Sequence, residues 1–277
     1  MPHHGTRLRN HRTRFLAVLG AVLAVLVAAV TPAAASYQSG PRPTVVLVHG
    51  AWADGSSWSK VTKRLIDDGY QVRVPPNPLR NLSTDAETIR DFLSTLSGPI
   101  VLVGHSYGGA VITNAATGNP NVKALVYVDA FAPAATEQIL SLAGADSALA
   151  VPPETVFDFV PYPGAPAGDV DLYLKHDTFV NSFASGMPRR QAEQLYPAQR
   201  PLALSAGFTP SGTPAWATIR SWYVLGTRDL IITPAAQEFM ATRAHSAITR
   251  IPAGHLGLIT DPGPVTQVIE TADHATR

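Results

Sequence analysis

The sequence predicts an α/β fold: a mostly parallel sheet of about six strands, with helices on both faces and an inserted cap. Short runs of branched apolar residues alternate with helical patterns along most of the 277 residues. The alternation breaks once, over residues 132–220. A hydrophobic content of 45% lets a chain of this length bury a full core. One domain with an insertion fits these numbers as well as two domains do.

The first 35 residues predict a secretory signal peptide. Residues 7–14 carry four arginines, residues 15–30 form an apolar run, and Ala33-Ala34-Ala35 is a small-residue cleavage site. We expect cleavage after Ala35, secretion, and no association with a membrane after cleavage. The alternative is an uncleaved membrane anchor. The shortness of the apolar run and the cleavage site favour a signal peptide.

Charge and composition exclude several function classes. The formal net charge is +1, and the N-terminal arginines account for it, so the rest of the chain carries more acidic than basic residues. This balance gives no reason to expect a nucleic-acid partner. No cluster has metal-ligand spacing and no glycine-rich loop fits a nucleotide, so we expect no metal and no cofactor. No long amphipathic surface indicates an obligate partner, which leaves a monomer or a homodimer.

The first half of the chain predicts four strands, at residues 44–48, 70–75, 99–103 and 122–129, of which those at 44–48 and 99–103 are expected to be buried. Helical patterns separate them. Ser56 or Ser57 caps a helix that runs to Gly69. Residues 84–87 form a capping box for the next helix, and Gly118 ends the helix after the third strand. Residues 36–131 therefore form the first part of the core.

Residues 132–220 contain eleven of the 24 prolines, which excludes long helices there. Short helices are expected at residues 136–143, 170–175 and 189–195. We interpret this segment as a cap inserted over the sheet rather than as an independent domain. Such caps exclude water and shape the choice of substrate.

Residues 221–277 restore the alternation and complete the core. Residues 221–226 and 247–252 predict the last two strands. The helix between them has Thr233 as its cap and Pro234 at its first position. A closing helix is expected from Asp261 to about residue 275.

One serine lies where the chain turns sharply from strand to helix. Ser106 is the centre of Gly104-His105-Ser106-Tyr107-Gly108, between the third strand and its helix. The glycines let strand and helix approach closely, and the turn holds the serine in a strained, exposed position. The pentapeptide alone is a weak signal, but with both flanking elements it predicts a nucleophile.

A serine hydroxyl needs a base, and the base needs a carboxylate that orients it and stabilises its cation. Asp229 and His255 follow Ser106 in the order serine, acid, histidine, and each comes after a predicted strand. Asp129 also ends a strand and is the alternative acid. The chain order favours Asp229. His255 is the preferred base because it lies in a glycine-containing turn after a late strand.

The oxyanion of such a reaction needs two backbone donors. We expect them to be the amides of Tyr107, at the start of the helix, and of Ala51, in the loop after the first strand. Candidates for the wall of the substrate pocket are the residues near these positions and in the cap, namely Gly50, Trp52, Phe131, His176 and Leu256. The simpler interpretation of His176 is a solvated side chain. For the aromatic residues, the simpler interpretation is a position in the hydrophobic core.

With these motifs identified, the chain resembles an α/β-hydrolase over about residues 44–274. The resemblance rests on V-L-V-H-G-A-W, G-H-S-Y-G-G, G-T-R-D and G-H-L. Within that superfamily it is similar to small bacterial esterases, plant methylesterases and plant hydroxynitrile lyases. The resemblance implies a serine esterase that cleaves a small or medium carboxylic ester or lactone through an acyl-enzyme.

Departures from relatives narrow the expected chemistry. The serine at position 106, instead of an aspartate, speaks against haloalkane dehalogenase and epoxide hydrolase activity. The lyases carry a lysine where this chain has Leu256 and a threonine where it has Gly50, which disfavours lyase activity. Two alternatives remain: a ligand-binding protein that keeps the fold without turnover, and lyase or perhydrolase chemistry on the same residues.

Overall fold

The computed structural model of the protein describes residues 1–4 and 42–277. The chain divides into two units, Met1–Gln38 and Ser39–Arg277. Residues 1–4 have no regular secondary structure, and all elements described below belong to the second unit. The predicted signal peptide, with its apolar run and cleavage site, lies outside the described residues. Among the described helices, none combines the length and the apolar character needed to cross a bilayer.

The core is one sheet of six parallel strands, as the sequence predicts. The strand order in the sheet is β2-β1-β3-β4-β8-β9. Its strands are β1 (Thr44–Val48), β2 (Gln71–Arg73), β3 (Ile100–His105), β4 (Val122–Val128), β8 (Ser221–Gly226) and β9 (Ala247–Ile251). The central strands are buried on both faces, which explains their continuous runs of branched apolar residues. All their carboxyl ends therefore lie along one edge.

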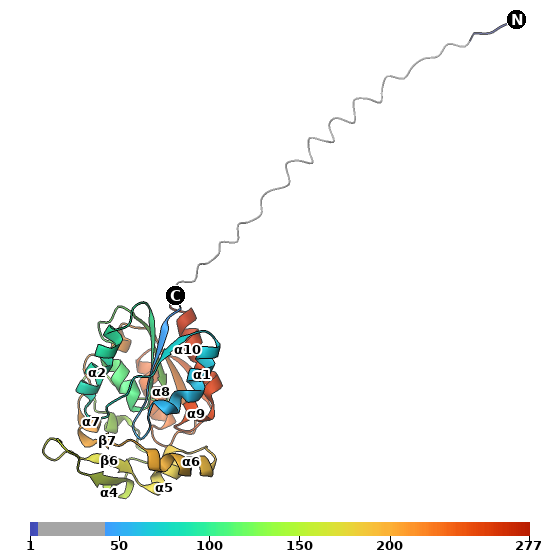
Figure 1. Ribbon diagram of the computed structural model, residues 1–277. Helices are drawn as coiled ribbons and strands as arrows, with labels where there is room; N and C mark the ends of the chain where they lie inside the picture. Colours follow the sequence, from blue (N-terminus) through green and yellow to red (C-terminus); the bar gives the residue numbers. More distant parts are fainter. Residues whose placement is uncertain (5–41) are drawn as a thin grey trace. The chain divides into compact units, whose positions relative to one another are not determined.

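Helices cover both faces of this sheet (Figure 1). One face is covered by α1 (Ser59–Asp67), α9 (Gly257–Thr260) and α10 (Pro262–His274). The other is covered by α2 (Leu82–Ser94), α3 (Tyr107–Ala115) and α8 (Pro234–Arg243). The predicted start of α8 is confirmed: the Thr233 hydroxyl accepts from the amide of Ala236, and Pro234 takes the first position.

Two other helix starts were predicted wrongly. The chain enters α1 through the 3-10 turn η1 (Gly55–Trp58), which Asp54 caps by accepting from the Ser56 amide, so neither Ser56 nor Ser57 is the cap. Residues 84–87 lie inside α2, whose cap is Asn81. Asp85 of that supposed capping box is fully buried and serves a tertiary contact instead. Both errors arise because several capping residues stand close together in the sequence.

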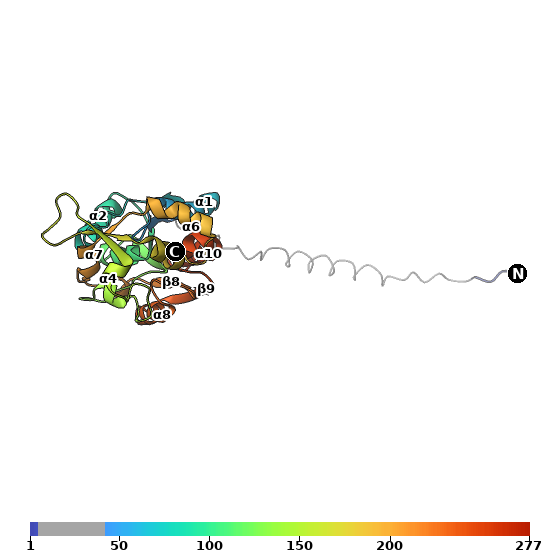
Figure 2. The ribbon, with the colours of Figure 1, turned by 90° about the horizontal axis from the view of Figure 1, so that it is seen from below.

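The cap, residues 132–220, leaves the core after β4 and returns at β8. It holds a separate antiparallel sheet of β5 (Phe157–Val160), β6 (Asp171–Leu174) and β7 (Leu202–Ala203). Its short helical elements are η2 (Ile139–Leu142), α4 (Pro153–Val156), α5 (His176–Thr178), η3 (Phe179–Phe183), α6 (Arg189–Leu195), η4 (Tyr196–Ala198), α7 (Leu204–Phe208) and η5 (Ala215–Ala217). Figure 2, seen from the cap side, shows these segments lying over the core.

The predicted helices of the cap had mixed outcomes. The one at 189–195 is confirmed as α6, and a single 3-10 turn, η2, forms within 136–143. The helix expected at 170–175 is wrong, because these residues form strand β6. Its backbone pairs with β5 and β7, which come from other parts of the cap, and no local pattern indicates those partners.

Candidate active site

Ser106 stands at the turn between β3 and α3 with a left-handed backbone, φ 52° and ψ −124°. The glycines around Ser106 leave room for the close approach of backbone segments that this turn requires. A Cβ on Gly104 would lie 2.5 Å from the Gly108 carbonyl oxygen, and one on Gly108 would collide with the Val48 carbonyl. Ser106 makes no side-chain cap to its own helix, so its hydroxyl is available for other partners. The strain is stored at the residue whose side chain must project from the turn.

Three side chains form a continuous hydrogen-bond chain at the carboxyl edge of the sheet. His255 Nε2 lies 2.9 Å from Ser106 Oγ, and His255 Nδ1 lies 2.8 Å from Asp229 Oδ2. The residues come from the ends of β3, β8 and β9, and all three are buried. The structure thus brings together residues that are 149 and 26 positions apart in the chain.

Asp229 is held by more donors than the sequence suggests. Its Oδ1 accepts from the amides of Ile231 and Ile232, at 2.7 and 3.1 Å, and its Oδ2 accepts from Gln237 Nε2 at 2.8 Å. Burial raises the pKa of Asp229, and these donors act in the opposite direction by stabilising the carboxylate. Gln237, on α8, has no sequence signal, because a glutamine in a helix usually faces solvent.

His255 is enclosed by aromatic side chains. The Phe183 ring from the cap lies 5.3 Å from the imidazole centre, and His105 lies on another side at 4.9 Å. His105 Nε2 is 2.9 Å from the His255 carbonyl and so holds the backbone of the turn. Burial lowers the pKa of His255 to about 3. The imidazole therefore stays neutral, the form in which it accepts a proton from a hydroxyl.

Asp129, the alternative acid, does not bond to the imidazole. Its Oδ2 accepts from the amide of Gly257 at 3.2 Å, two residues after His255. Burial, together with the neighbouring Asp229, raises the pKa of Asp129 well above its ordinary value. Of the two carboxyls at this edge, Asp229 is the one in hydrogen-bond contact with His255.

The two expected oxyanion donors flank Ser106. Tyr107 follows it as the first residue of α3, and a Cβ on Gly50, next to Ala51, would lie 2.6 Å from Ser106 Cβ. Among residues 42–277, neither the Tyr107 nor the Ala51 amide donates a backbone bond outside the helix and strand ladders. Tyr107 is also fixed by its hydroxyl, which donates to the buried Asp85 at 2.7 Å.

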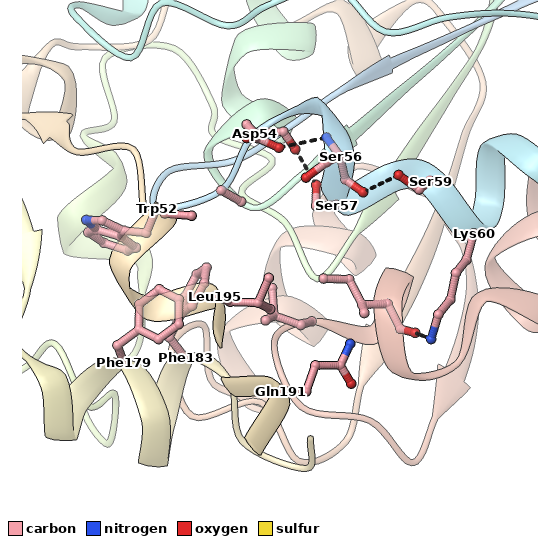
Figure 3. A pocket seen from close by; sticks show the side chains of 14 residues that line it. Trp52, Asp54, Ser56, Ser57, Ser59, Lys60, Phe179, Phe183, Gln191 and Leu195 are labelled. Atoms are coloured by element: carbon pink, nitrogen blue, oxygen red, sulfur yellow. Dashed lines mark hydrogen bonds between the residues drawn. The ribbon is translucent and has the colours of Figure 1, made fainter. Parts of the chain in front are cut away.

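A cavity of about 210 Å³ lies between the loop after β1 and the cap (Figure 3). Ser106, Asp229 and His255 are not part of its lining, but Leu256 and Phe183, whose ring packs on His255, are. Trp52, Phe179 and Phe183 form its aromatic side. The full lining is Trp52, Ala53, Asp54, Ser56, Ser57, Ser59, Lys60, Phe179, Phe183, Gln191, Leu195, Ala198, Leu256 and Ile259. Several of its polar groups already pair within the protein; Lys60 Nζ, for example, donates to the Ile259 carbonyl.

The sequence-predicted pocket residues divide between this cavity and other places. Trp52 and Leu256 line it. Gly50 is buried against Ser106, and Phe131 is a core residue whose amide donates to the Ser106 carbonyl at 3.1 Å. His176 is not in the wall: its side chain is 41% exposed and pairs with Glu193 at 2.7 Å and Asp177 at 3.0 Å. These acidic partners raise the pKa of His176.

Comparison with known proteins places the chain in a family. Over 128 residues it is 35% identical to a carbendazim hydrolyzing esterase of Nocardioides sp., an alignment that covers 42% of this chain and 51% of that protein. The chain thus matches about half the length of that relative. It is 27% identical over 259 residues to an alpha/beta hydrolase of Aspergillus novofumigatus, covering 83% of this chain and 96% of that one.

Solved structures agree on the fold. The crystal structure of polyneuridine aldehyde esterase superposes with a TM-score of 0.70 at 17% identity, over 83% of this chain and 99% of that chain. The sequence description of the alpha/beta hydrolase family matches residues 45–268, from β1 into α10. This span includes the Ser106 turn, Asp129, Asp229, His255 and the whole cap. The chain therefore belongs to the alpha/beta hydrolase family.

Proposed function

We propose that the protein is a serine hydrolase that cleaves a small or medium carboxylic ester or lactone without a cofactor. The observation that carries the proposal is the hydrogen-bond chain from Ser106 Oγ through His255 to Asp229 Oδ2, at 2.9 and 2.8 Å. A neutral imidazole between a hydroxyl and a carboxylate is the arrangement that activates a serine. The name of the Nocardioides relative, an esterase, supports the same reaction class.

In the proposed mechanism, His255 Nε2 takes the Ser106 proton as Oγ attacks the carbonyl carbon of the ester. Asp229 stabilises the resulting imidazolium. The amides of Ala51 and Tyr107 donate to the oxyanion of the tetrahedral intermediate. The intermediate collapses when the imidazolium gives its proton to the departing alcohol, leaving an acyl group on Ser106. Water, deprotonated by His255, then releases the acid and restores the serine.

The cavity between the loop after β1 and the cap indicates the kind of group the substrate carries. Aromatic and aliphatic side chains form its inner wall, and Lys60, its one lysine, already donates to a backbone carbonyl. A charged group placed against these aromatic and aliphatic side chains would lose its hydration without a compensating partner there. We therefore propose substrates that are uncharged on the side of this cavity.

The decisive experiment is labelling with a fluorophosphonate probe, alongside hydrolysis of p-nitrophenyl esters of increasing acyl length. We expect the protein to be labelled and to turn over short esters, and we expect Ser106→Ala to abolish both. Residual catalysis without the nucleophile is generally a factor of 10³ to 10⁴ above water, far below that of the intact enzyme. Labelling that persists in Ser106→Ala would contradict the mechanism.

The same measurements separate the alternatives. A ligand-binding protein would show no turnover across the ester panel while binding some ligand tightly. Cyanide release from mandelonitrile would reveal lyase chemistry, and peracid formation from acetate and peroxide would reveal perhydrolase chemistry. We expect neither to exceed ester hydrolysis.

We also propose that the protein is secreted and cleaved after Ala35, on the basis of the N-terminal sequence pattern. Expression of the full chain in a secreting bacterial host, followed by N-terminal sequencing of the extracellular protein, tests this. Ser36 is the expected first residue. Retention of the full-length chain in the membrane fraction would favour the anchor.

A further inference from the structure

Asp129 is a buried carboxyl that the proposed mechanism leaves without a task. It follows β4 directly and has a left-handed backbone, φ 45°, in a residue that is 0% exposed. Its carboxyl fits a space made by two glycines: a Cβ on Gly226 would lie 2.7 Å from its Oδ1, and one on Gly257 would lie 2.6 Å from its Oδ2. Such a close fit at a strained residue indicates a specific role.

The two oxygens of this carboxyl differ in their surroundings. Oδ2 accepts from the Gly257 amide at 3.2 Å, whereas Oδ1 has no partner within hydrogen-bond distance among the described residues. The Gly226 amide lies near the carboxyl and acts in favour of its charged form. Oδ1 faces the same space above Gly226 as the carbonyl oxygens of Ala253 and Gly254, which would lie 2.9 and 3.1 Å from a Cβ there. An ionised Oδ1 would be repelled by carbonyl oxygens, but a protonated one could donate to them.

The charges around Asp129 favour its protonated form. None of the ion pairs of the described chain includes it. The titratable groups that interact with it are Asp229 and the Tyr223 hydroxyl, and neither is a cation. Asp229 has three donors besides the imidazole, whereas Asp129 has the Gly257 amide and, at longer range, the Gly226 amide. When two buried carboxyls share a site, the proton goes to the one with fewer donors.

We propose that Asp129 is a positioning residue that acts as a neutral carboxylic acid, clamping the turn of residues 253–257 that carries His255. Its Oδ2 holds the Gly257 amide, and its protonated Oδ1 donates to the carbonyl side of the same turn. The burial of the group and the adjacent Asp229 raise the pKa of Asp129 in the direction this requires. Because it acts through His255, the inference rests on the proposed function.

Neutrality also explains how two carboxyls coexist at one imidazole. A second carboxylate beside His255 would stabilise the imidazolium and compete with Asp229 for the orientation of the ring. A neutral acid supplies two hydrogen bonds to the turn and adds no charge. Asp229 then remains the single carboxylate that faces Nδ1.

The first test compares Asp129→Asn, Asp129→Ala and wild type. Asparagine keeps an acceptor for the Gly257 amide and a donor for the carbonyls, so we expect kcat/KM within about threefold of wild type and an unchanged pH profile. Alanine removes the clamp, and we expect kcat to fall at least about tenfold with little change in KM, because the base is misplaced. The matched control is Asp273→Ala. Asp273 is a buried carboxyl in α10 that pairs with Tyr70 and Arg277, and its replacement should leave kcat unchanged.

Three results would overturn the proposal. Loss in Asp129→Asn on the order of 10³ would make Asp129 the working acid instead of Asp229. A shift of the acidic limb of the pH profile to lower pH in Asp129→Asn would show that a negative charge had been removed. Full activity in Asp129→Ala would show that the turn needs no clamp.

Infrared difference spectroscopy reads the protonation state without relying on activity. We expect the wild-type minus Asp129→Asn spectrum at neutral pH to contain the carbonyl stretch of a protonated carboxylic acid, shifted by exchange into D₂O. Carboxylate bands in its place would contradict the proposal. Absence of fluorophosphonate labelling in the wild type would instead contradict the proposed function, so the two failures are distinguishable.

Discussion

Ser106 carries positive φ without being glycine, and the neighbouring backbone is built to tolerate it. Gly104 and Gly108 let β3, α3 and β1 meet around the turn, and Gly50 lets the loop after β1 lie directly on Ser106. Each of these glycines is required by a close approach to another segment, not by local flexibility. The position of one hydroxyl thus depends on the absence of side chains at three others.

Gly50→Ala tests this dependence. The new methyl group would lie 2.6 Å from Ser106 Cβ and 2.9 Å from the His105 carbonyl, so Ser106 or the loop after β1 must shift. We expect kcat/KM for p-nitrophenyl acetate to fall by roughly 10², the cost of a misplacement of about 1 Å. Gly263→Ala, whose Cβ would meet nothing within 4 Å, is the control and should keep full activity. Equal activities of the two variants would contradict the interpretation.

The buried imidazole predicts the pH dependence of the reaction. Burial lowers the pKa of His255 from its ordinary 6.5 to about 3, so the neutral base persists as the pH falls below 6.5. We expect the acidic limb of the kcat/KM profile to lie below pH 6.5, toward the lowered value, and activity to be kept at pH 6. The measurement is kcat/KM for an uncharged ester from pH 4 to 8. An acidic limb at or above pH 6.5 would show an imidazole that water reaches.

At the scale of elements, Trp52 joins the loop after β1 to the cap. Its amide donates to the Arg200 carbonyl at 2.8 Å, and its indole Nε1 donates to the Leu172 carbonyl, on β6, at 2.9 Å. Its ring stacks on Phe157 of β5 at 5.8 Å and meets Phe183 edge-on at the same distance. Because Trp52 also lines the cavity, the seating of the cap and the shape of the cavity are set by one side chain.

Trp52→Phe should separate these two effects. It removes the indole donor and leaves the buried Leu172 carbonyl without that partner, so we expect a loss of about 1–3 kcal/mol in the free energy of unfolding by urea. We also expect KM to rise for aryl esters, because the ring that lines the cavity is smaller. Trp216→Phe loses a similar bond, to the Pro133 carbonyl at 3.0 Å, away from the cavity. A rise in KM in both variants would argue against a specific role of Trp52.

At the scale of the whole molecule, every described element belongs to the unit Ser39–Arg277. The parallel sheet, its helices and the cap pack into one continuous apolar core. The chain has no cysteine, so no disulfide adds to that packing. Cooperative unfolding of core and cap together is expected from such an arrangement.

A chain that begins at Ser36 should therefore fold and work like the full-length protein. We expect the same urea midpoint and the same kcat/KM on p-nitrophenyl acetate, within error, because no described element is removed. Circular dichroism and fluorescence should give coincident unfolding transitions. Two separate transitions would instead mean that the cap and the core unfold independently.

Local signals in the sequence predicted the core well. Short apolar segments between helical patterns marked all six parallel strands, and Thr233-Pro234 marked the start of α8. They also marked the strand ends at which Ser106, Asp229 and His255 stand, although the catalytic roles of these residues stay predictions. The capping residues of α1 and α2 were misassigned, because Asp54 and Asn81 stand close to serines and threonines of similar capacity.

By itself the sequence determined the alternation of strands and helices, the turn at Ser106 and the edge of the sheet where its candidate partners lie. These depend on short-range sterics: branched side chains favour strands, glycines allow close turns, and prolines exclude long helices. Only the tertiary structure decided that Asp229 rather than Asp129 contacts His255, that residues 171–174 form a strand, and that Trp52 connects the cap to the loop after β1. Those outcomes depend on the register of β4, β8 and β9 and on contacts between residues far apart in the chain, which no local pattern encodes.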